Sequence, residues 1–244
     1  MYYFIYRYYP GENMKGRPHF YSKRLALNSF INAYRNVHAE KKLIFVVDGP
    51  PSPISLLDCH EELVTETHFL NGIGNSSSYL RALEYIVELD GNDIFYLSED
   101  DYLYLPQALS AFVDVIERLA LVHYATLYDH PDRYTRSDNK SVPGGEYIYI
   151  SNTNHWRTVE STCCTFGGRV LALKEDLDIH EKFTRNKNAP GDRNIWYKTI
   201  GIREYFRKHA KRVLIAPIPS LATHMESEYL SPFIDWEAIA TSIS

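Results

Sequence analysis

Residues 94–101, Ile-Phe-Tyr-Leu-Ser-Glu-Asp-Asp, decide the expected fold, because an apolar stretch runs directly into three acidic residues. A short apolar run of this kind predicts a buried strand. In open α/β sheets, ligands bind at the carboxyl ends of the strands. We therefore expect Glu99, Asp100 and Asp101 at a binding site. If the backbone stays extended, Glu99 and Asp101 point to one side and Asp100 points to the other.

Three adjacent carboxylates repel one another, so a positive group is expected beside them. Hard divalent cations such as Mg²⁺ and Mn²⁺ prefer oxygen ligands, take one or two protein carboxylates, and complete their shell with water and phosphate oxygens. The triplet therefore indicates a cation site suited to a diphosphate. The alternative is a solvated cluster before a helix, where the helix dipole favours acidic residues. The triplet alone does not separate the two.

The rest of the chain alternates apolar runs with helical patterns, which is typical of strands covered by helices. Ser22 is an acceptable N-cap, and the apolar residues after it recur at helical spacing. No internal repeat and no linker interrupt the pattern. We therefore predict a single α/β domain over residues 1–244, with a mixed, mostly parallel central sheet flanked by helices. Strands are expected at residues 2–8, 43–48, 62–70, 94–101, 121–128 and 213–216, and as paired strands within 146–168. Helices are expected after Ser22, after 72–78, around 109–116, around 171–183 and from Arg193.

Composition excludes several classes of protein. The chain has 244 residues, 45% hydrophobic and 23% charged content, and a formal net charge of −5, which is typical of a globular protein and not of a disordered one. Lysine and arginine are scattered, so nucleic acid is not expected as a partner. No stretch approaches the roughly 20 apolar residues of a transmembrane helix. Three cysteines are too few for a disulfide framework, so we expect a cytoplasmic protein with reduced thiols.

Two segments together resemble the glycosyltransferases of the GT-A fold. The first is G-I-G-N-S-S-S-Y-L-R-A-L-E-Y-I at residues 72–86, and the second is I-F-Y-L-S-E-D-D-Y-L-Y-L-P-Q-A-L at residues 94–109. In that family a glycine-led helix precedes a strand that ends in the acidic DxD motif, of which Glu99-Asp100-Asp101 would be an EDD variant. The resemblance implies a single GT-A-like domain with a nucleotide-binding half over about 1–105 and an acceptor-binding half over about 106–244.

The resemblance also implies roles for residues on the donor side. Asp101 would ligate a Mn²⁺ or Mg²⁺ ion, and His224 would complete the metal site. Asp48 would meet the base or ribose of the nucleotide, although a strand-terminal Asp before Gly49 can equally form a local turn. Further contacts to the nucleotide sugar are expected from four residues: Tyr8, Arg81, Glu99 and Asp100. Tyr8 can instead pack in the core, and Arg81 can instead be a solvated helix residue.

On the acceptor side, the resemblance points to Asp192 as the general base that takes the proton from the acceptor hydroxyl, with inversion at the anomeric carbon. Its alternative is an N-cap for the helix that follows. Acceptor contacts are expected from Trp156, Arg157 and the loop at residues 129–145, while a buried anchor is the alternative for Trp156. Catalysis by the adjacent Cys163 and Cys164 is not expected, since free cysteine usually behaves as a small buried hydrophobe.

The resulting hypothesis is a metal-dependent glycosyltransferase of polysaccharide biosynthesis. It would move a sugar from a nucleotide-sugar donor to a hydroxyl of a glycan or related acceptor. A nucleotidyltransferase could use a similar sheet, but the G-x-G-x-R loop that it needs after the first strand is replaced by Pro10-Gly11-Glu12. A non-catalytic module that binds nucleotide sugar or glycan, and transfer to a DNA base, stay open as alternatives.

Overall fold

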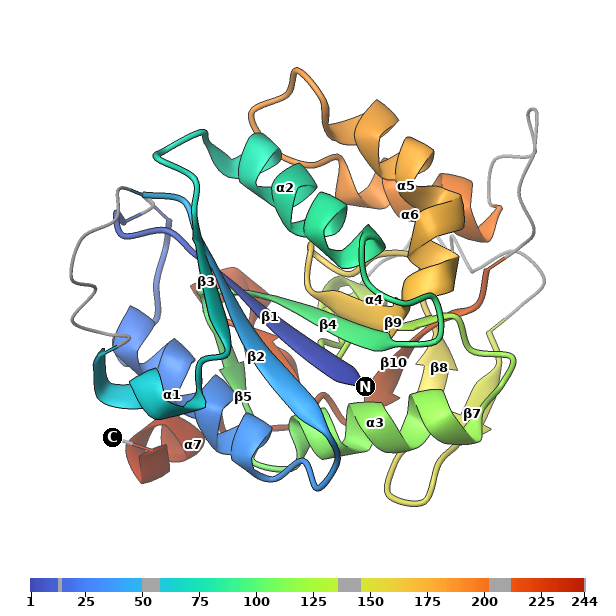
Figure 1. Cartoon of the computed structure of the whole chain (residues 1–244). Helices are drawn as coiled ribbons and strands as arrows, with labels where there is room; N and C mark the ends of the chain where they lie inside the picture. The colour runs from blue at the N-terminus through green and yellow to red at the C-terminus, as the bar shows by residue number, and fades with distance from the viewer. Residues whose placement is uncertain (13–14, 50–57, 136–145, 202–211, 244) are drawn as a thin grey trace.

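The computed structural model describes residues 1–12, 15–49, 58–135, 146–201 and 212–243 of the chain. Within these residues, nine strands form one sheet in the order β3-β2-β1-β4-β9-β6-β10-β8-β7 (Figure 1). The pairings make β8 and β9 antiparallel to the other seven strands, so the sheet is mixed and mostly parallel, as predicted. The strands are β1 (Tyr2–Tyr8), β2 (Lys41–Val47), β3 (Glu66–Phe69), β4 (Ile94–Glu99), β6 (Tyr124–Ala125), β7 (Ile148–Ile150), β8 (His155–Thr158), β9 (Phe166–Arg169) and β10 (Leu214–Ile218).

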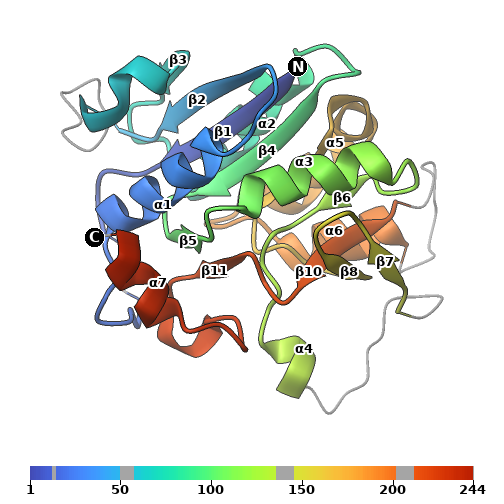
Figure 2. The ribbon, with the colours of Figure 1, turned by 90° about the horizontal axis from the view of Figure 1, so that it is seen from below.

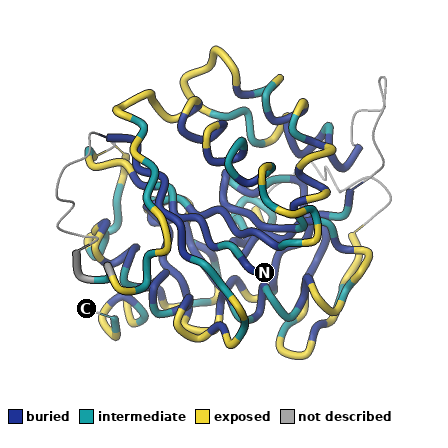
Figure 3. The backbone as a smooth tube through the Cα atoms, viewed as in Figure 1, coloured by how far each residue is buried: buried dark blue, intermediate teal, exposed yellow. Residues whose placement is uncertain are grey.

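Helices cover both faces of this sheet (Figure 1). On one face lie α1 (Lys23–Arg35), α3 (Ala108–Arg118) and α7 (Trp236–Ile243). On the other lie α2 (Asn75–Val87), α5 (Val170–Thr184) and α6 (Asp192–Ile200). Two apolar cores result, and β1 contributes to both, with Phe4 and Tyr6 toward α1 and Ile5 toward α2. The buried strands between the two helical layers are visible in Figure 3.

The register of the first strands decides where the polar residues meet. Strand β1 lies between β2 and β4 and runs parallel to both, which places Arg7 opposite Val46 on one side and Glu99 on the other. The carboxyl ends of the three strands therefore lie at one edge of the sheet. Helix α1 starts as predicted, since the Ser22 hydroxyl accepts a hydrogen bond of 3.0 Å from the Leu25 amide.

Two glycines on β9 allow a close approach between strands. A Cβ on Gly167 would lie 2.4 Å from the Phe95 carbonyl oxygen, and one on Gly168 would lie 2.3 Å from the carbonyl oxygen of His123. Both distances are shorter than van der Waals contact. The sequence Thr-Phe-Gly-Gly is thus explained by the packing of β9 between β4 and β6.

A second, two-stranded sheet was not predicted. It pairs β5 (Tyr102–Tyr104) with β11 (Ala222–His224) in antiparallel fashion, with His224 opposite Tyr102 (Figure 2). The expected strand at 121–128 is shorter than predicted, since ladder pairing is confined to β6, and the one at 62–70 is reduced to β3 after a 3₁₀ segment, Asp58–Leu63. A short helix, α4 (Asp132–Thr135), and a 3₁₀ turn, Ser227–Tyr229, complete the elements.

Candidate active site

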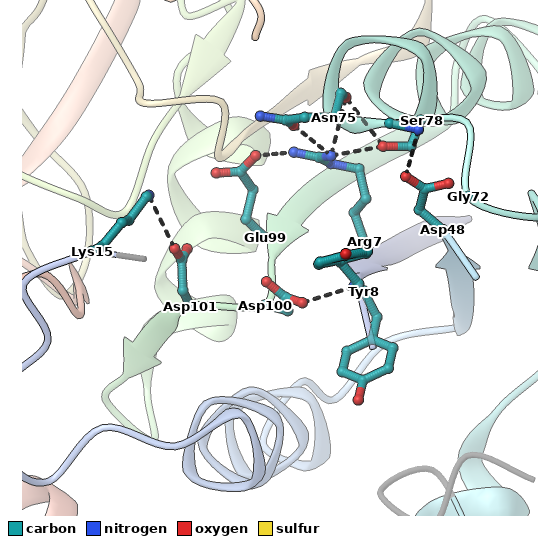
Figure 4. Close-up of a pocket in the computed structure, with 12 residues that line it drawn as sticks. Arg7, Tyr8, Lys15, Asp48, Gly72, Asn75, Ser78, Glu99, Asp100 and Asp101 are labelled. Carbon is teal, nitrogen blue, oxygen red and sulfur yellow. Dashed lines mark hydrogen bonds and ion pairs between the residues drawn. The ribbon is translucent and has the colours of Figure 1, made fainter. Parts of the chain in front are cut away.

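A cleft of about 640 Å³ opens at the carboxyl ends of β1, β2 and β4, beside the N-terminus of α2 (Figure 4). This is the edge at which the acidic triplet was predicted to act. The residues that line the cleft are Arg7, Tyr8, Tyr9, Lys15, Asp48, Gly72, Gly74, Asn75, Ser78, Glu99, Asp100 and Asp101.

Glu99 forms an ion pair with Arg7, its neighbour across the β1–β4 ladder. The Arg7 guanidinium also donates hydrogen bonds to the Asn75 side-chain oxygen at 2.8 Å and to the Ser78 hydroxyl at 2.9 Å. Both acceptors lie in the first turn of α2 (Figure 4). Burial raises the pKa of the Glu99 carboxyl, and the charge of Arg7 opposes this shift. Arg7 therefore ties β1, β4 and α2 together on the cleft wall.

Asp100 is buried on the opposite side of the strand and binds two donors. Its Oδ2 lies 2.8 Å from the Lys23 ammonium and 2.8 Å from the Tyr9 amide nitrogen. Lys23 is itself buried at the start of α1. Asp100 thus fixes the chain that leaves β1.

Asp101 meets His224, although 123 residues separate them. The Oδ2 atom of Asp101 lies 3.0 Å from Nε2 of His224, and the imidazole stacks on the ring of Tyr102 at 5.1 Å between centroids. The same Oδ2 accepts from Arg17 at 3.0 Å and lies 3.5 Å from the Lys15 ammonium. Burial alone would raise the pKa of Asp101, but His224, Lys15 and Arg17 outweigh it and hold the pKa well below its ordinary value.

The three acids are therefore neutralised by cationic side chains from residues 7–23. A positive group beside the triplet was expected, and here protein cations supply the charge, each from the segment that follows or ends β1. In the sequence these lysines and arginines are scattered and form no run. The β1–β4 pairing is the feature that brings them to the end of β4, where Arg7, Lys15, Arg17 and Lys23 contact the triplet.

The donor set around Asp101 has the spacing of a metal site. Two adjacent ligands about 2.1 Å from an octahedral ion lie about 3.0 Å apart, and Oδ2 and Nε2 have this separation. The Oδ1 atom of Asp101 is buried and has no hydrogen-bond partner among the described residues. However, the Lys15 ammonium lies within 3.5 Å of both ligand atoms. In the described part of the chain, no three His, Cys, Asp or Glu side chains group as a metal site. With Lys15 in place, the set does not fit the predicted Mn²⁺ or Mg²⁺.

Asp48 lies at the carboxyl end of β2 and lines the cleft. Its two carboxylate oxygens accept hydrogen bonds from the backbone amides of Ile73 at 2.7 Å and Gly74 at 2.9 Å. Gly74 has a positive φ of 89°, which suits glycine. Asp48 thus holds the loop that leads into α2, where the sequence offered a local turn as the alternative. Tyr8 lines the same cleft.

Arg81 lies away from the cleft. Its guanidinium pairs with Glu84 on the same helix at 2.6 Å, and its side chain is 63% exposed. The structure does not bring this residue to the other predicted donor contacts. Arg7 and Lys15, in contrast, both line the cleft.

Asp192 is the first residue of α6 and holds a neighbouring turn. Its carboxylate accepts hydrogen bonds from the amide and hydroxyl of Thr162, from the Cys164 amide at 3.1 Å, and from the indole of Trp196 at 3.0 Å. It makes no N-cap bond to its own helix. The turn continues to Thr165, whose hydroxyl accepts from the Glu99 amide at 3.3 Å. Asp192 is therefore connected to the cleft through this turn and does not line it.

The predicted acceptor contacts are buried. The Trp156 ring is fully enclosed, and its indole N–H donates to Ser151 at 3.2 Å, so it is the buried anchor that the sequence left open. Arg157 pairs with the buried Asp129 at 2.6 Å, and its guanidinium lies over the ring of Tyr134. Residues 136–145 of the predicted acceptor loop lie outside the described residues.

Cys164 is buried and Cys163 is half-buried, and burial raises the pKa of each thiol well above its ordinary value. A protonated thiol is a poor nucleophile. This agrees with the expectation that neither cysteine is catalytic.

Solved structures with a similar fold come from two classes of transferase. TarS from S. aureus aligns with a TM-score of 0.49 at 12% identity, over 81% of this chain and 54% of that one. A 4-diphosphocytidyl-2C-methyl-D-erythritol synthase aligns with a TM-score of 0.50 at 9% identity, over 100% and 99% of the two chains. The mannosyltransferase PcManGT from Pyrobaculum calidifontis, solved with GDP-Man and Mn²⁺, aligns with a TM-score of 0.37 at 14% identity, over 54% and 36%.

The likeness to the synthase concerns the fold alone, and together with the mixed, mostly parallel sheet it confirms the predicted α/β class. The chain spans about half of the TarS structure to which it is similar. No protein-family model and no curated protein sequence matches it. None of the helices in the described ranges is long and apolar enough to cross a membrane.

Proposed function

We propose that the protein transfers a sugar from a nucleotide-sugar donor to a hydroxyl of a glycan or related acceptor. The observation that carries this proposal is the cleft at the carboxyl ends of β1, β2 and β4. Its volume of about 640 Å³ falls within the roughly 300–1,000 Å³ of small-molecule sites. Arg7 and Lys15 line the cleft, which opens beside the N-terminus of α2. Cationic side chains and helix N-termini both favour the binding of phosphate.

Within this proposal the donor's nucleoside lies near Tyr8 and Asp48, and its diphosphate lies toward Lys15 and Asp101. Asp101 and His224 are the pair that would hold a divalent cation, whose chemistry is to neutralise the leaving diphosphate. The Lys15 ammonium lies beside both residues and opposes metal binding, so no step is assigned to a metal.

For the acceptor, we assign proton removal to Asp192, although its carboxylate does not line the cleft and must exchange its hydrogen bonds from Thr162, Cys164 and Trp196 for the acceptor hydroxyl. Its carboxylate would take the proton of the acceptor hydroxyl as the bond from that oxygen to the anomeric carbon forms. The bond from the anomeric carbon to the diphosphate oxygen breaks, and its electron pair leaves with the nucleoside diphosphate. A single displacement of this kind inverts the anomeric centre. Support for this part comes from the turn that links Asp192 to Glu99, and the product anomer tests it.

The experiment is a panel of nucleotide sugars titrated by calorimetry, followed by an assay for release of nucleoside diphosphate. Asp101→Asn removes the carboxylate that holds Lys15, Arg17 and His224 at the end of the cleft, and it should abolish turnover. Arg81→Gln is the matched control, because this exposed side chain lies outside the cleft, and it should leave turnover unchanged. An active Asp101→Asn variant would contradict the site assignment.

The same panel separates the alternative functions. A nucleotidyltransferase would instead release pyrophosphate from a nucleoside triphosphate and a sugar phosphate. Binding of a nucleotide sugar without hydrolysis or transfer would indicate a binding module.

A further inference from the structure

The Lys15 ammonium lies at the end of the cleft beside a small acidic cluster, which consists of Asp101, Glu226 and His224. It lies 3.5 Å from Oδ2 of Asp101, 3.4 Å from Oε2 of Glu226 and 3.4 Å from Nε2 of His224. The side chain is 34% exposed and faces the cleft (Figure 4).

The charges of this acidic cluster and of the basic side chains beside it are balanced without a further ion. Asp101 and Glu226 supply two negative charges, and Lys15 and Arg17 supply two positive ones. Arg17 is held from several sides, since it also donates to the Met225 carbonyl at 2.8 Å and lies over an aromatic ring. A divalent ion added to these four charged side chains would leave an excess of two positive charges at the site.

The imidazole of His224 adds a second constraint. Each ring nitrogen has one in-plane position, which carries either a proton or a lone pair. Nε2 therefore either donates to Asp101 or offers its lone pair to a cation. Lys15 and Asp101 both lie at that nitrogen, so a metal must displace Lys15 to bind it.

We propose that Lys15 is the resident cation of this site, so that the protein binds its donor and releases the nucleoside diphosphate without a divalent metal. This inference rests on the proposed function for the identity of the donor. Lys15 would face the diphosphate with one positive charge, supported by Arg17, at the place where a metal was predicted.

Competition between Lys15 and Mn²⁺ provides a test that needs no nucleotide. Free Mn²⁺ is followed by electron paramagnetic resonance while the metal alone is titrated into the wild-type chain, Lys15→Met and the charge-conserving Lys15→Arg. Removal of a positive charge adjacent to the binding position should tighten Mn²⁺ binding by at least about tenfold in Lys15→Met. Lys15→Arg should bind as weakly as the wild type.

Equal Mn²⁺ affinity in the wild type and Lys15→Met would overturn the proposal, as would failure of both to bind. A circular dichroism spectrum of each variant establishes that it is folded.

A second arm uses UDP, GDP and CDP in calorimetry with EDTA or with Mn²⁺. The nucleotide that binds should do so with the same affinity, within about twofold, in both conditions. Loss of binding in EDTA would overturn the proposal. If no nucleotide or nucleotide sugar binds at all, the proposed function fails, while the metal titration still decides whether Lys15 fills a cation site.

Discussion

His180 on α5 makes the stability of the protein depend on pH in a way that can be calculated. The ring is fully buried, stacks on Phe166, and shares a hydrogen bond of 2.9 Å between Nδ1 and the Tyr79 hydroxyl. Its Nε2 has no hydrogen-bond partner among the described residues. Burial lowers the pKa of His180 to about 3, whereas a histidine in an unfolded chain has a pKa of about 6.5.

The folded protein therefore binds fewer protons at His180 than the unfolded chain does between these two values. The stabilisation is fully present above pH 6.5 and is lost as the pH falls toward 3. Between pH 7 and pH 5 the free energy of unfolding should drop by about 2 kcal/mol from this group alone.

The assay is urea unfolding of the wild type and His180→Gln at pH 7 and pH 5. Glutamine does not titrate, so the variant should lose about 2 kcal/mol less than the wild type between the two values, whatever constant cost the substitution carries. His19→Gln, at a side chain that is 72% exposed, is the matched control and should follow the wild type. If the wild type and His180→Gln lose the same free energy, the reasoning is refuted.

Three further substitutions test the packing and the charge balance. Gly167→Ala places a Cβ against the Phe95 carbonyl and should destabilise the fold by about 1–3 kcal/mol in thermal unfolding; an unchanged melting temperature would contradict the close approach. Arg7→Met leaves the carboxylate of Glu99 without its cation and should lower the free energy of unfolding in urea by about 3–5 kcal/mol. Adding Glu99→Gln should recover most of this loss; a double variant that is no more stable than Arg7→Met would contradict the pairing. Asp192→Asn turns an amide nitrogen toward a backbone donor and should lower the free energy of unfolding by about 1–3 kcal/mol. Loss of activity with an unchanged melting temperature would instead show that the residue acts in the reaction and not only on the turn.

The fold was predictable where a segment carries its own pattern. Strands β1, β2 and β4 each contain a run of four or five apolar residues, and α1 and α5 have helical periodicity with a buried stripe. The small sheet was not predictable, because β5 and β11 are three residues long and pair across more than a hundred residues. Such strands form because tertiary packing brings them together, and no local pattern marks them.

The site was predictable as a location and less so as chemistry. The acidic triplet indicated the end of β4, and the family resemblance linked Asp101 to His224, which the structure brings together. The cations were missed, since nothing in the sequence connects residues 7–23 with the triplet until β1 is placed beside β4. The resemblance located Arg81 on the correct helix, but its side chain points into solvent.

The order of strands in the large sheet has a consequence for synthesis on the ribosome. Strand β10 lies between β6 and β8, and the strand that carries His224 follows it in the chain. A nascent chain can pair β1, β2 and β4 early, but Asp101 can contact His224 only after more than a hundred further residues have been synthesised. Contacts of this length form late and slow folding. A ligand that requires the Asp101–His224 pair would therefore bind only finished molecules, and its binding would report completion of the fold.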